Sequence, residues 1–354
     1  MIIHLSKSAS PEQKETILNK ITSKGFNYEI SHGSTGIDII GVLGDLSGIE
    51  ESYFAEAEGV EKVIRISKPY KQVSREFSAA TKIIEIDGIK IGGEKPVMMA
   101  GPCSVESESQ IMAVADYVAE LGIPFLRGGA YKPRTSPYSF QGMGVEGLKI
   151  LDKARKKYGL KIVTEATGMH CHILEDGSVE KKSVLDNVID YTDIIQIGTR
   201  NMKSYGFLQA LAMKTRESKI PILLKRGDSS TLKDFLLAAE YIVSNGNPNV
   251  ILCLRGIKTF EESKFQRATA DIGAVAVLKQ ESNLPVLFDP SHSTGYRNRV
   301  YAMSMAALAA GADGLLIETH NDPSSALCDG EQSITREQLA AIIKNAAKIK
   351  DAAG

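Results

Sequence analysis

The sequence is poor in cysteine and has almost no net charge, and these two shortages exclude several classes of protein. Its 354 residues include four cysteines (Cys103, Cys171, Cys253 and Cys328), which lie far apart and form no Cys-x-x-Cys pair. A disulfide framework and a zinc knuckle are therefore not expected. Because 42 basic residues balance 43 acidic ones, the formal net charge is −1, so nothing favours bulk attraction to nucleic acid or to a membrane.

Long apolar runs are also missing. No apolar stretch reaches the roughly 18 residues of a membrane-spanning helix, and the segment MIIHLSKSASPEQKE lacks the basic and apolar regions of a secretory signal peptide. The composition is that of a globular protein, with 43% hydrophobic and 24% charged residues. We therefore expect a soluble, cytoplasmic protein with one large domain and a smaller one.

Residues 1–67 contain elements in the order β-α-β-β-α-β. The first segment, MIIHLS, is typical of a strand, and the next is typical of a helix with Ser10 as N-cap, Pro11 at its first position and Gly25 after its end. This order predicts a ferredoxin-like domain, a common regulatory or binding module. A polar linker follows over residues 68–82. Residues 83–92 then alternate around Asp87-Gly88, which indicates a β-hairpin.

The rest of the chain, assigned with this hairpin to a domain over residues 83–354, repeats one pattern. Eight apolar runs alternate with segments of helical periodicity. The runs are PVMMAGPC, IPFLRGGAY, KIVTEAT, TDIIQIGTR, PILLKRG, NVILCLRG, PVLFDPSH and DGLLIETH. Eight β/α repeats in about 250 residues predict a (β/α)8 TIM barrel, an α/β fold whose parallel strands are buried on both faces. We expect the hairpin to cover the N-terminal mouth of the barrel.

Polar side chains gather where the predicted strands end, which is where TIM barrels carry their chemistry. Seven are cations: Arg127, Lys132, Arg134, Arg200, Lys225, Arg226 and Arg255. Any one of them could simply pair with a neighbouring carboxylate, but the few carboxylates at the same end cannot account for all. Arginine binds phosphate and carboxylate groups through two hydrogen bonds at once. The pattern therefore indicates a site for two phosphorylated or otherwise dianionic ligands.

A second group of strand-end residues is typical of a metal site. Cys103, His292, Glu318 and Asp329 follow predicted strands 1, 7 and 8, which become neighbours when the barrel closes. A thiolate, an imidazole and two carboxylates suit one divalent ion such as Mn²⁺, Fe²⁺, Co²⁺ or Zn²⁺. Taken singly, Cys103 could be a packing thiol and His292 a hydrogen-bonded strand-end residue. The four together favour a metal site.

The motifs AGPCSVES, LRGGAYKPRTSPYSFQG, IQIGTRNM, LLKRG, DPSHSTG and ALCDG resemble those of the 3-deoxy-D-arabino-heptulosonate 7-phosphate (DAHP) synthases. The resemblance is to the subtype with an N-terminal ferredoxin-like regulatory domain, and the linker segment KPYKQVSREF fits it too. It implies that phosphoenolpyruvate condenses with erythrose 4-phosphate and water to give DAHP and phosphate, the first step of the shikimate pathway. Feedback inhibition by tyrosine or phenylalanine and a homotetramer are further implications.

The resemblance also implies a role for each matching residue. Cys103, His292, Glu318 and Asp329 would bind the metal. Phosphoenolpyruvate would be held by Arg127, Lys132, Arg200, Lys225 and Arg255. The phosphate of erythrose 4-phosphate would be bound by Arg134 and Thr135.

The residue types suit this condensation on chemical grounds as well. A metal ion can act as a Lewis acid on the aldehyde oxygen, and a rigid cationic site can hold two anions in attack geometry. Lys132 is a candidate proton donor, with a pKa that we expect neighbouring cations to lower. Glu165 is a candidate for positioning the attacking water. His292, a candidate metal ligand, is also counted among the candidate catalytic residues.

Two features depart from the family pattern. Residues 168–184 make a longer connection than expected, and Asp176-Gly177 predicts a hairpin there that could be a lid or an intersubunit contact. His170 and His172 within it could hold a second metal, although a solvated loop is favoured. Cys328 stands where serine is expected. It could form a disulfide with Cys103 after metal loss, although a neutral exchange of small residues is favoured.

Three other functions remain open. A related enzyme could condense phosphoenolpyruvate with another aldose phosphate, such as arabinose 5-phosphate. A Schiff-base aldolase could use Lys225 as its nucleophile, but this would leave the four candidate metal ligands unexplained. A regulatory protein on an inactive barrel should have lost some of the expected ligands, whereas all are present.

Overall fold

The structure is a computed structural model of the chain and describes residues 1–32, 38–46, 48–65, 68–133, 136, 138–173, 178–261 and 265–353. It divides into two compact units. The first comprises Met1–Thr81 and Glu281–Asn283, and the second comprises Lys82–Gln280 and Leu284–Gly354. Within the described residues, no helix is both long enough and apolar enough to cross a membrane.

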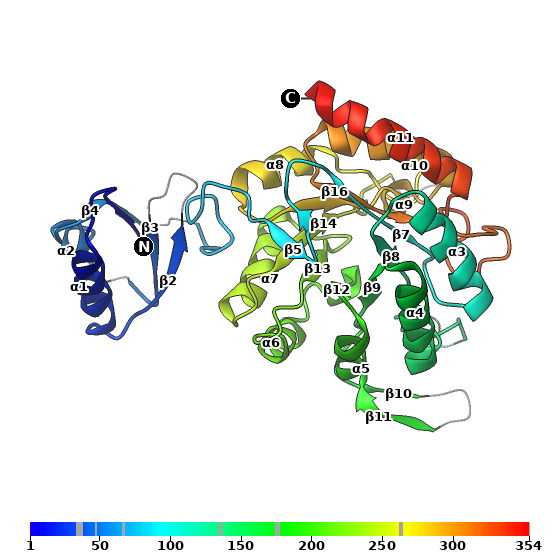
Figure 1. Cartoon of the computed structure of the whole chain (residues 1–354), viewed down its shortest axis with the longest axis horizontal. Coiled ribbons are helices and arrows are strands. Elements are labelled where there is room, and N and C mark those ends of the chain that lie inside the picture. The colour runs from blue at the N-terminus through cyan, green and yellow to red at the C-terminus, as the bar shows by residue number, and fades with distance from the viewer. Residues whose placement is uncertain are drawn as a thin grey trace. The chain divides into compact units, whose positions relative to one another are not determined.

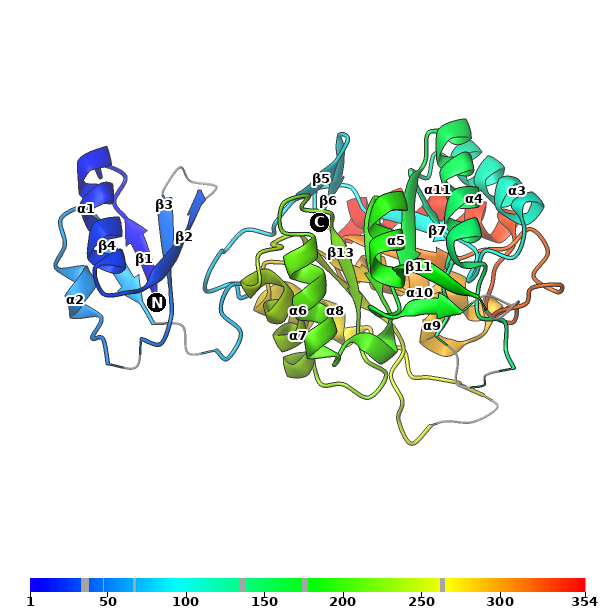
Figure 2. The same ribbon diagram turned by 90° about the horizontal axis from the view of Figure 1, so that it is seen from below.

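The first unit contains a four-stranded antiparallel sheet with α1 and α2 on one face (Figure 2). Its elements are β1 (Ile2–Leu5), α1 (Pro11–Thr22), β2 (Asn27–His32), β3 (Asp38–Leu43), α2 (Ser52–Ala55) and β4 (Val60–Ile64), and the strand order is β2-β3-β1-β4. Helix α1 begins with a capping box between Ser10 and Gln13. Its buried Ile17 and Ile21 pack against the sheet in one core cluster. The predicted ferredoxin-like domain is confirmed.

The second unit is a closed barrel of eight parallel strands surrounded by helices (Figure 1). The strands are β7 (Val97–Gly101), β8 (Phe125–Arg127), β9 (Lys161–Glu165), β12 (Ile194–Ile197), β13 (Ile222–Lys225), β14 (Val250–Leu254), β15 (Val286–Phe288) and β16 (Gly314–Glu318). The barrel closes where β16 pairs with β7, with Glu318 opposite Gly101. The predicted TIM barrel is therefore confirmed.

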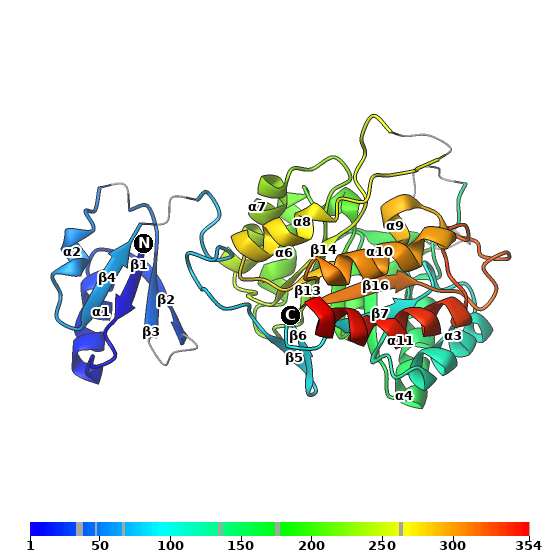
Figure 3. The same ribbon diagram turned by 90° about the horizontal axis from the view of Figure 1, so that it is seen from above.

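Helices follow the strands. They are α3 (Glu108–Glu120), α4 (Gly144–Tyr158), α5 (Val184–Tyr191), the 3-10 turn η1 (Thr199–Asn201), α6 (Tyr205–Lys214), α7 (Leu232–Ser244), α8 (Gly273–Glu281), α9 (Ser291–Thr294), α10 (Arg297–Ala309) and α11 (Arg336–Ala353). The longer ones form the outer layer, whereas the short η1 and α9 lie at the C-terminal mouth. Figure 3 shows α10 and α11 side by side along β16 and β7. The hydroxyls of Ser107, Ser183 and Thr231 cap α3, α5 and α7, which fixes where these three strand-to-helix loops end.

A hairpin closes the N-terminal mouth of the barrel. Its strands β5 (Ile84–Ile86) and β6 (Ile89–Ile91) pair antiparallel around Asp87 and Gly88, whose φ angles are 46° and 84°. Positive φ at both turn residues is what a two-residue type I′ turn requires. Ile84 and Ile91 are buried in one cluster with residues near the starts of the barrel strands, such as Val97. The predicted cover is thus confirmed, and the polar strand ends lie at the opposite mouth.

The long connection after β9 forms a separate antiparallel pair, β10 (Cys171–Ile173) and β11 (Val179–Ser183). This pairing confirms the predicted hairpin, whereas the turn expected at Asp176-Gly177 lies outside the described residues. Figure 1 shows the pair at the periphery of the barrel, beside α5. Strand β11 runs directly into α5 through the N-cap Ser183.

Candidate active site

The C-terminal mouth of the barrel contains a cavity of ≈ 380 Å³ with a mostly polar wall. Seven cations line it: Arg127, Lys132, Arg200, Lys225, Arg255, Lys258 and Arg267. Three carboxylates, those of Glu165, Asp228 and Asp329, line the same wall. The ends of different strands therefore bring an excess of positive charge around one cavity, in a chain with almost no net charge.

Neighbouring carboxylates neutralise only some of these cations. Four have an ion-pair partner: Arg127 with Glu318, Lys132 with Glu165, Lys225 with Asp289, and Arg267 with Asp329. Arg200, Arg255 and Lys258 have none within the described part of the chain. Ion pairs within the protein therefore explain the presence of some of these cations but not of all seven.

Arg255 is a cavity-lining cation whose hydrogen-bonding capacity the described residues leave partly unused. Its Nη1 donates to Thr199 Oγ1 at 3.0 Å, and its Nη2 donates to the carbonyl of His292 at 3.5 Å. Its buried Nε has no hydrogen-bond partner among the described residues. Burial lowers the pKa of this guanidinium, because desolvation disfavours the charged form. Since a buried unpaired donor is costly, the position favours an anionic ligand.

Arg226 does not join the group. It follows Lys225 directly, pairs with Asp271 at 2.7 Å and donates from Nε and Nη2 to the carbonyl of Ser230. The prediction that it converges with the other strand-end cations is therefore wrong, because successive side chains of an extended segment point to opposite faces. Two further predicted residues, Arg134 and Thr135, lie outside the described residues.

Lys258 and Arg267 line the cavity although sequence reasoning missed them. Both come from the connection between β14 and α8 rather than from the end of a strand. A strand-end search cannot find residues that a long loop carries back over the mouth. Their positive charge is the only signal that the sequence offers.

Lys132 reaches the cavity because Gly129, in the loop after β8, leaves room for the lysine side chain to pass close to the backbone. Its Nζ donates to the carbonyl of Cys103 at 3.1 Å. A Cβ at Gly129 would lie 2.7 Å from Lys132 Cδ and 2.8 Å from the Cys103 carbonyl oxygen, so a larger residue does not fit.

The pKa of Lys132 is shifted in the direction opposite to the prediction. Burial disfavours its charge, but the electrostatic influence of Cys103 and of the Glu165 carboxylate outweighs burial and raises the pKa of Lys132 above its ordinary value. The predicted lowering is therefore wrong. The prediction considered the cations near Lys132 but not the acidic groups that the fold places beside this lysine.

Glu165 and Arg200 enter the cavity from neighbouring strand ends. Glu165 is the last residue of β9, is buried, and places Oε2 3.6 Å from Lys132 Nζ. Space for it depends on Gly198, where a Cβ would lie 2.0 Å from Glu165 Oε1. Arg200 belongs to η1, just after β12, and lines the cavity.

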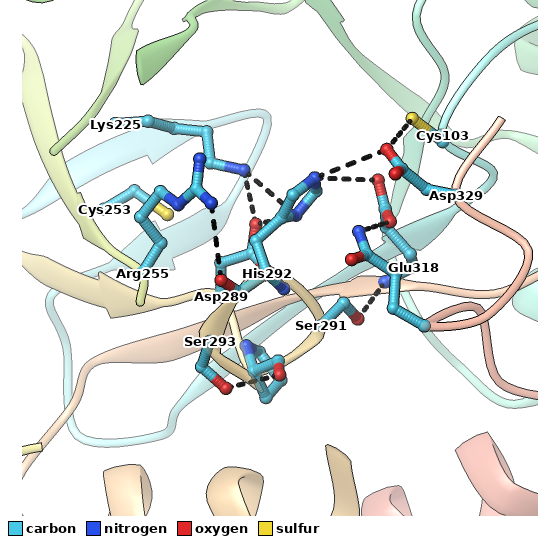
Figure 4. Close-up of polar contacts among 12 residues, drawn as sticks. Cys103, Lys225, Cys253, Arg255, Asp289, Ser291, His292, Ser293, Glu318 and Asp329 are labelled. Carbon is cyan, nitrogen blue, oxygen red and sulfur yellow. Dashed lines mark hydrogen bonds and ion pairs between the residues drawn. The ribbon is translucent and has the colours of Figure 1, made fainter. Parts of the chain in front are cut away.

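Cys103, His292, Glu318 and Asp329 come together at one side of the mouth (Figure 4). His292 Nε2 lies 3.5 Å from Glu318 Oε1 and 3.9 Å from Asp329 Oδ2. Cys103 Sγ lies 3.1 Å from the same Asp329 oxygen. The four predicted ligands are therefore neighbours in space, and their soft sulfur, imidazole and carboxylate donors fit a divalent transition-metal ion.

Asp289 orients the imidazole of His292. Its carboxylate lies 2.7 Å from His292 Nδ1, accepts from the His292 backbone N–H at 2.8 Å and also pairs with Lys225 (Figure 4). A proton on Nδ1 leaves the lone pair of Nε2 facing Glu318 and Asp329. Burial lowers the pKa of His292, which favours the neutral form that binds metals. A carboxylate in this position is the usual support of a metal-binding histidine.

The β10–β11 pair contacts the loop that carries Lys132. Tyr131 donates to Glu180 of β11 at 2.8 Å, and the other oxygen of Glu180 accepts from the Val145 N–H of α4 at 3.0 Å. His172 of β10 lies edge-on against Tyr131, with ring centroids 5.2 Å apart. The pair therefore supports the loop from outside, a contact that has no signal in the sequence. That the β10–β11 pair acts as a lid or as an intersubunit contact stays a prediction.

Comparison with known proteins connects this arrangement to one family. Residues 71–353 match the DAHP synthetase I family, and residues 1–68 match the DAHP synthase ferredoxin-like domain. A phospho-2-dehydro-3-deoxyheptonate aldolase of Thermotoga maritima is 43% identical over 354 residues, which cover 100% of this chain and 99% of the relative. A 2-dehydro-3-deoxyphosphooctonate aldolase of Acidithiobacillus ferrooxidans is 32% identical over 262 residues, 69% of this chain and 85% of the relative.

Solved structures agree with these matches. The crystal structure of the Thermotoga maritima phospho-2-dehydro-3-deoxyheptonate aldolase (DAHP synthase) has a TM-score of 0.73 at 42% identity and covers 99% of this chain and 97% of that chain. A truncated form of the 3-deoxy-D-arabino-heptulosonate 7-phosphate synthase of that organism has a TM-score of 0.69 at 42% identity, covering 80% of this chain and 97% of that chain. The heptonate relatives thus match more of the chain than the octonate relative.

Replacing Asp289 with asparagine tests the orientation of His292. We expect Asp289→Asn to weaken Mn²⁺ binding about 10- to 100-fold, the usual effect of losing a carboxylate that supports a ligating histidine. Calorimetric titration of Mn²⁺ into metal-stripped protein measures this. Asp228→Asn, a cavity-wall carboxylate without a contact to His292, is the control and should leave the affinity unchanged. Equal affinities for Asp289→Asn and the unaltered protein would contradict the assignment.

Proposed function

Since this chain belongs to the DAHP synthetase I family and condenses phosphoenolpyruvate with erythrose 4-phosphate to give DAHP, we propose that the cationic cavity at the C-terminal mouth is its active site. Both substrates are phosphate esters, and phosphoenolpyruvate also carries a carboxylate. The observation that carries the proposal is the set of cations that line the cavity together with the buried Nε of Arg255, which has no hydrogen-bond partner among the described residues. Anions of this kind would supply the missing acceptors.

Phosphoenolpyruvate is held by five of the cations in this proposal: Arg127, Lys132, Arg200, Lys225 and Arg255. Arg127 and Lys225 are kept in place by Glu318 and Asp289, which also contact His292. The residues that bind this substrate are therefore continuous with the candidate metal ligands. Arg134 and Thr135, by the family motif, bind the phosphate of erythrose 4-phosphate.

A divalent ion held by Cys103, His292, Glu318 and Asp329 would supply a Lewis acid for the aldehyde oxygen of erythrose 4-phosphate. Asp289 keeps the His292 imidazole correctly turned for this purpose, and burial favours its neutral form. The donor set suits Mn²⁺, Fe²⁺, Co²⁺ and Zn²⁺, and the choice among them is part of the proposal.

The remaining steps belong to side chains of the chain itself. The methylene carbon of phosphoenolpyruvate forms the new bond to the aldehyde carbon, and Lys132, whose raised pKa keeps its Nζ protonated, donates a proton to the aldehyde oxygen. Water, positioned by Glu165, adds to C2 of phosphoenolpyruvate, and one of its protons restores the proton that Lys132 gave up. The bond between C2 and the phosphate oxygen then breaks as C2 becomes the ketone, and the second proton leaves with the phosphate. The cations that line the cavity hold both anions in attack geometry.

We propose that the ferredoxin-like domain is regulatory and makes the enzyme sensitive to tyrosine or phenylalanine. A homotetramer and a cytoplasmic location are proposed on the same basis, the likeness to the subtype that carries this domain. Residues 68–81 of the first unit hydrogen-bond to Glu281–Asn283, for example from Asn283 N–H to the Val73 carbonyl at 3.0 Å. A truncation at residue 67 keeps these bonds.

The activity itself is tested by phosphate release from phosphoenolpyruvate plus erythrose 4-phosphate. We expect EDTA to abolish release and added Mn²⁺ to restore it, because the Lewis acid is removed and then replaced. Turnover with arabinose 5-phosphate but not with erythrose 4-phosphate would favour the alternative reaction. Activity that survives EDTA and is trapped by borohydride would instead indicate a Schiff base on Lys225.

Arg255→Lys tests the anion site. We expect kcat/KM for phosphoenolpyruvate to fall about 10- to 100-fold, mainly through KM, because charge-assisted hydrogen bonds worth roughly 1.5–3 kcal/mol are lost. Steady-state kinetics at saturating erythrose 4-phosphate measure this. Arg226→Lys is the matched control, since Arg226 is a buried strand-end arginine outside the cavity wall. Equal effects of the two substitutions would contradict the proposed site.

Deleting residues 1–67 tests the regulatory role. We expect the truncated enzyme to keep its catalytic activity, since the cavity belongs entirely to the second unit. Inhibition by tyrosine or phenylalanine should disappear. Dose–response curves for both amino acids on the full and truncated chains measure the difference. Undiminished inhibition of the truncated enzyme would place the effector site on the barrel.

A further inference from the structure

Cys328 brings a second sulfur to the candidate metal ligands. Its Sγ lies 2.8 Å from Cys103 Sγ and 3.5 Å from Asp329 Oδ2. Cys103, Cys328 and Asp329 each place one potential ligand atom within 4.8 Å of the others, and Asp329 is shared with the cluster of His292 and Glu318. Cys328 is only 5% exposed and is a free thiol, as is Cys103. A thiol at this position is therefore within reach of any ion that Cys103 and Asp329 bind.

The backbone holds Cys328 there for two reasons. Asp329 has a φ of 54°, and this left-handed turn lets two successive side chains face Cys103, whereas an extended segment would point them to opposite sides. Glu106 Oε1 accepts from the Leu327 N–H at 3.0 Å and from Ser104 Oγ at 3.1 Å. The segment that carries Cys328 is thus tied to the segment that carries Cys103.

We propose that Cys328 is a further ligand of the ion bound by Cys103, His292, Glu318 and Asp329, so that this chain presents two thiolates to the metal. The inference rests on the metal site of the proposed function and deepens it. Thiolates are soft ligands that favour Zn²⁺, Cd²⁺ and Fe²⁺ over Mn²⁺, which carboxylates suit better. The serine expected at this position would offer only a hard hydroxyl oxygen. The second thiolate therefore moves the metal preference of this chain toward softer ions.

Cobalt is the probe for counting sulfur ligands. Co²⁺ is titrated into the full-length, EDTA-treated protein in anaerobic, reducing buffer, and the near-ultraviolet thiolate-to-cobalt absorbance is measured per bound ion. We expect Cys328→Ser to lower this absorbance by about half, because one of two thiolates is lost. Cys171→Ser is the matched control, since Cys171 is exposed on β10, and should leave the absorbance unchanged. Far-ultraviolet circular dichroism checks that each variant is folded.

Competition between ions gives a second readout. We expect Cys328→Ser to weaken Cd²⁺ binding about tenfold or more and to change Mn²⁺ binding much less, since only the softer ion gains from sulfur. Unchanged cobalt absorbance and an unchanged ratio of Cd²⁺ to Mn²⁺ affinity would overturn the inference. In that case, loss of the absorbance in Cys103→Ser would show that the proposed metal site stands without Cys328.

If the proposed ligands bind no metal at all, the cobalt titration gives a different result. Absence of any thiolate-to-cobalt absorbance in the unaltered protein would overturn both the inference and the proposed ligand set. A Cys103–Cys328 disulfide that persists in reducing buffer, found by mass spectrometry of alkylated peptides, would also overturn the inference.

Discussion

The site depends on how the barrel closes. Pairing of β16 with β7 puts Glu318 opposite Gly101, so the end of the last strand meets the segment that leads to Cys103. A shift of one residue in this register would turn Glu318 to the other face of the sheet. Residues 215 positions apart in the sequence, Cys103 and Glu318, therefore share a site only because the first and last strands of the barrel are neighbours in this register.

Buried charges then connect the two halves of the site. Asp289 contacts both His292 and Lys225, and Glu318 contacts both Arg127 and His292. Each carboxylate therefore serves one candidate metal ligand and one candidate substrate cation. An isolated buried charge is unfavourable, whereas these groups are paired and hydrogen-bonded. The arrangement of fixed charges exists before any substrate enters, so little reorganisation remains for the moment of reaction.

The sequence predicts much of this architecture because parallel barrel strands are buried on both faces and appear as apolar runs. The strand-end rule then locates Arg127, Glu165, Lys225, Arg255 and Glu318. The same rule fails for Arg226, since it carries no information on which face a side chain takes. It also misses Lys258 and Arg267, which a long connection carries to the mouth. The direction of the Lys132 pKa shift depends on distances to Cys103 and Glu165 that only the folded chain defines.

Glu180 joins the inserted strands β10 and β11 to the barrel through hydrogen bonds. Its carboxylate accepts hydrogen bonds from Tyr131, from the Val145 N–H and from Asn187, and Tyr131 and Asn187 are almost fully buried. Removing β10 and β11 would leave these donors without their acceptor in the interior of the barrel wall. The β10–β11 segment is therefore part of the hydrogen-bonded wall of this barrel, and shortening it without also replacing Tyr131 and Asn187 would destabilise the fold.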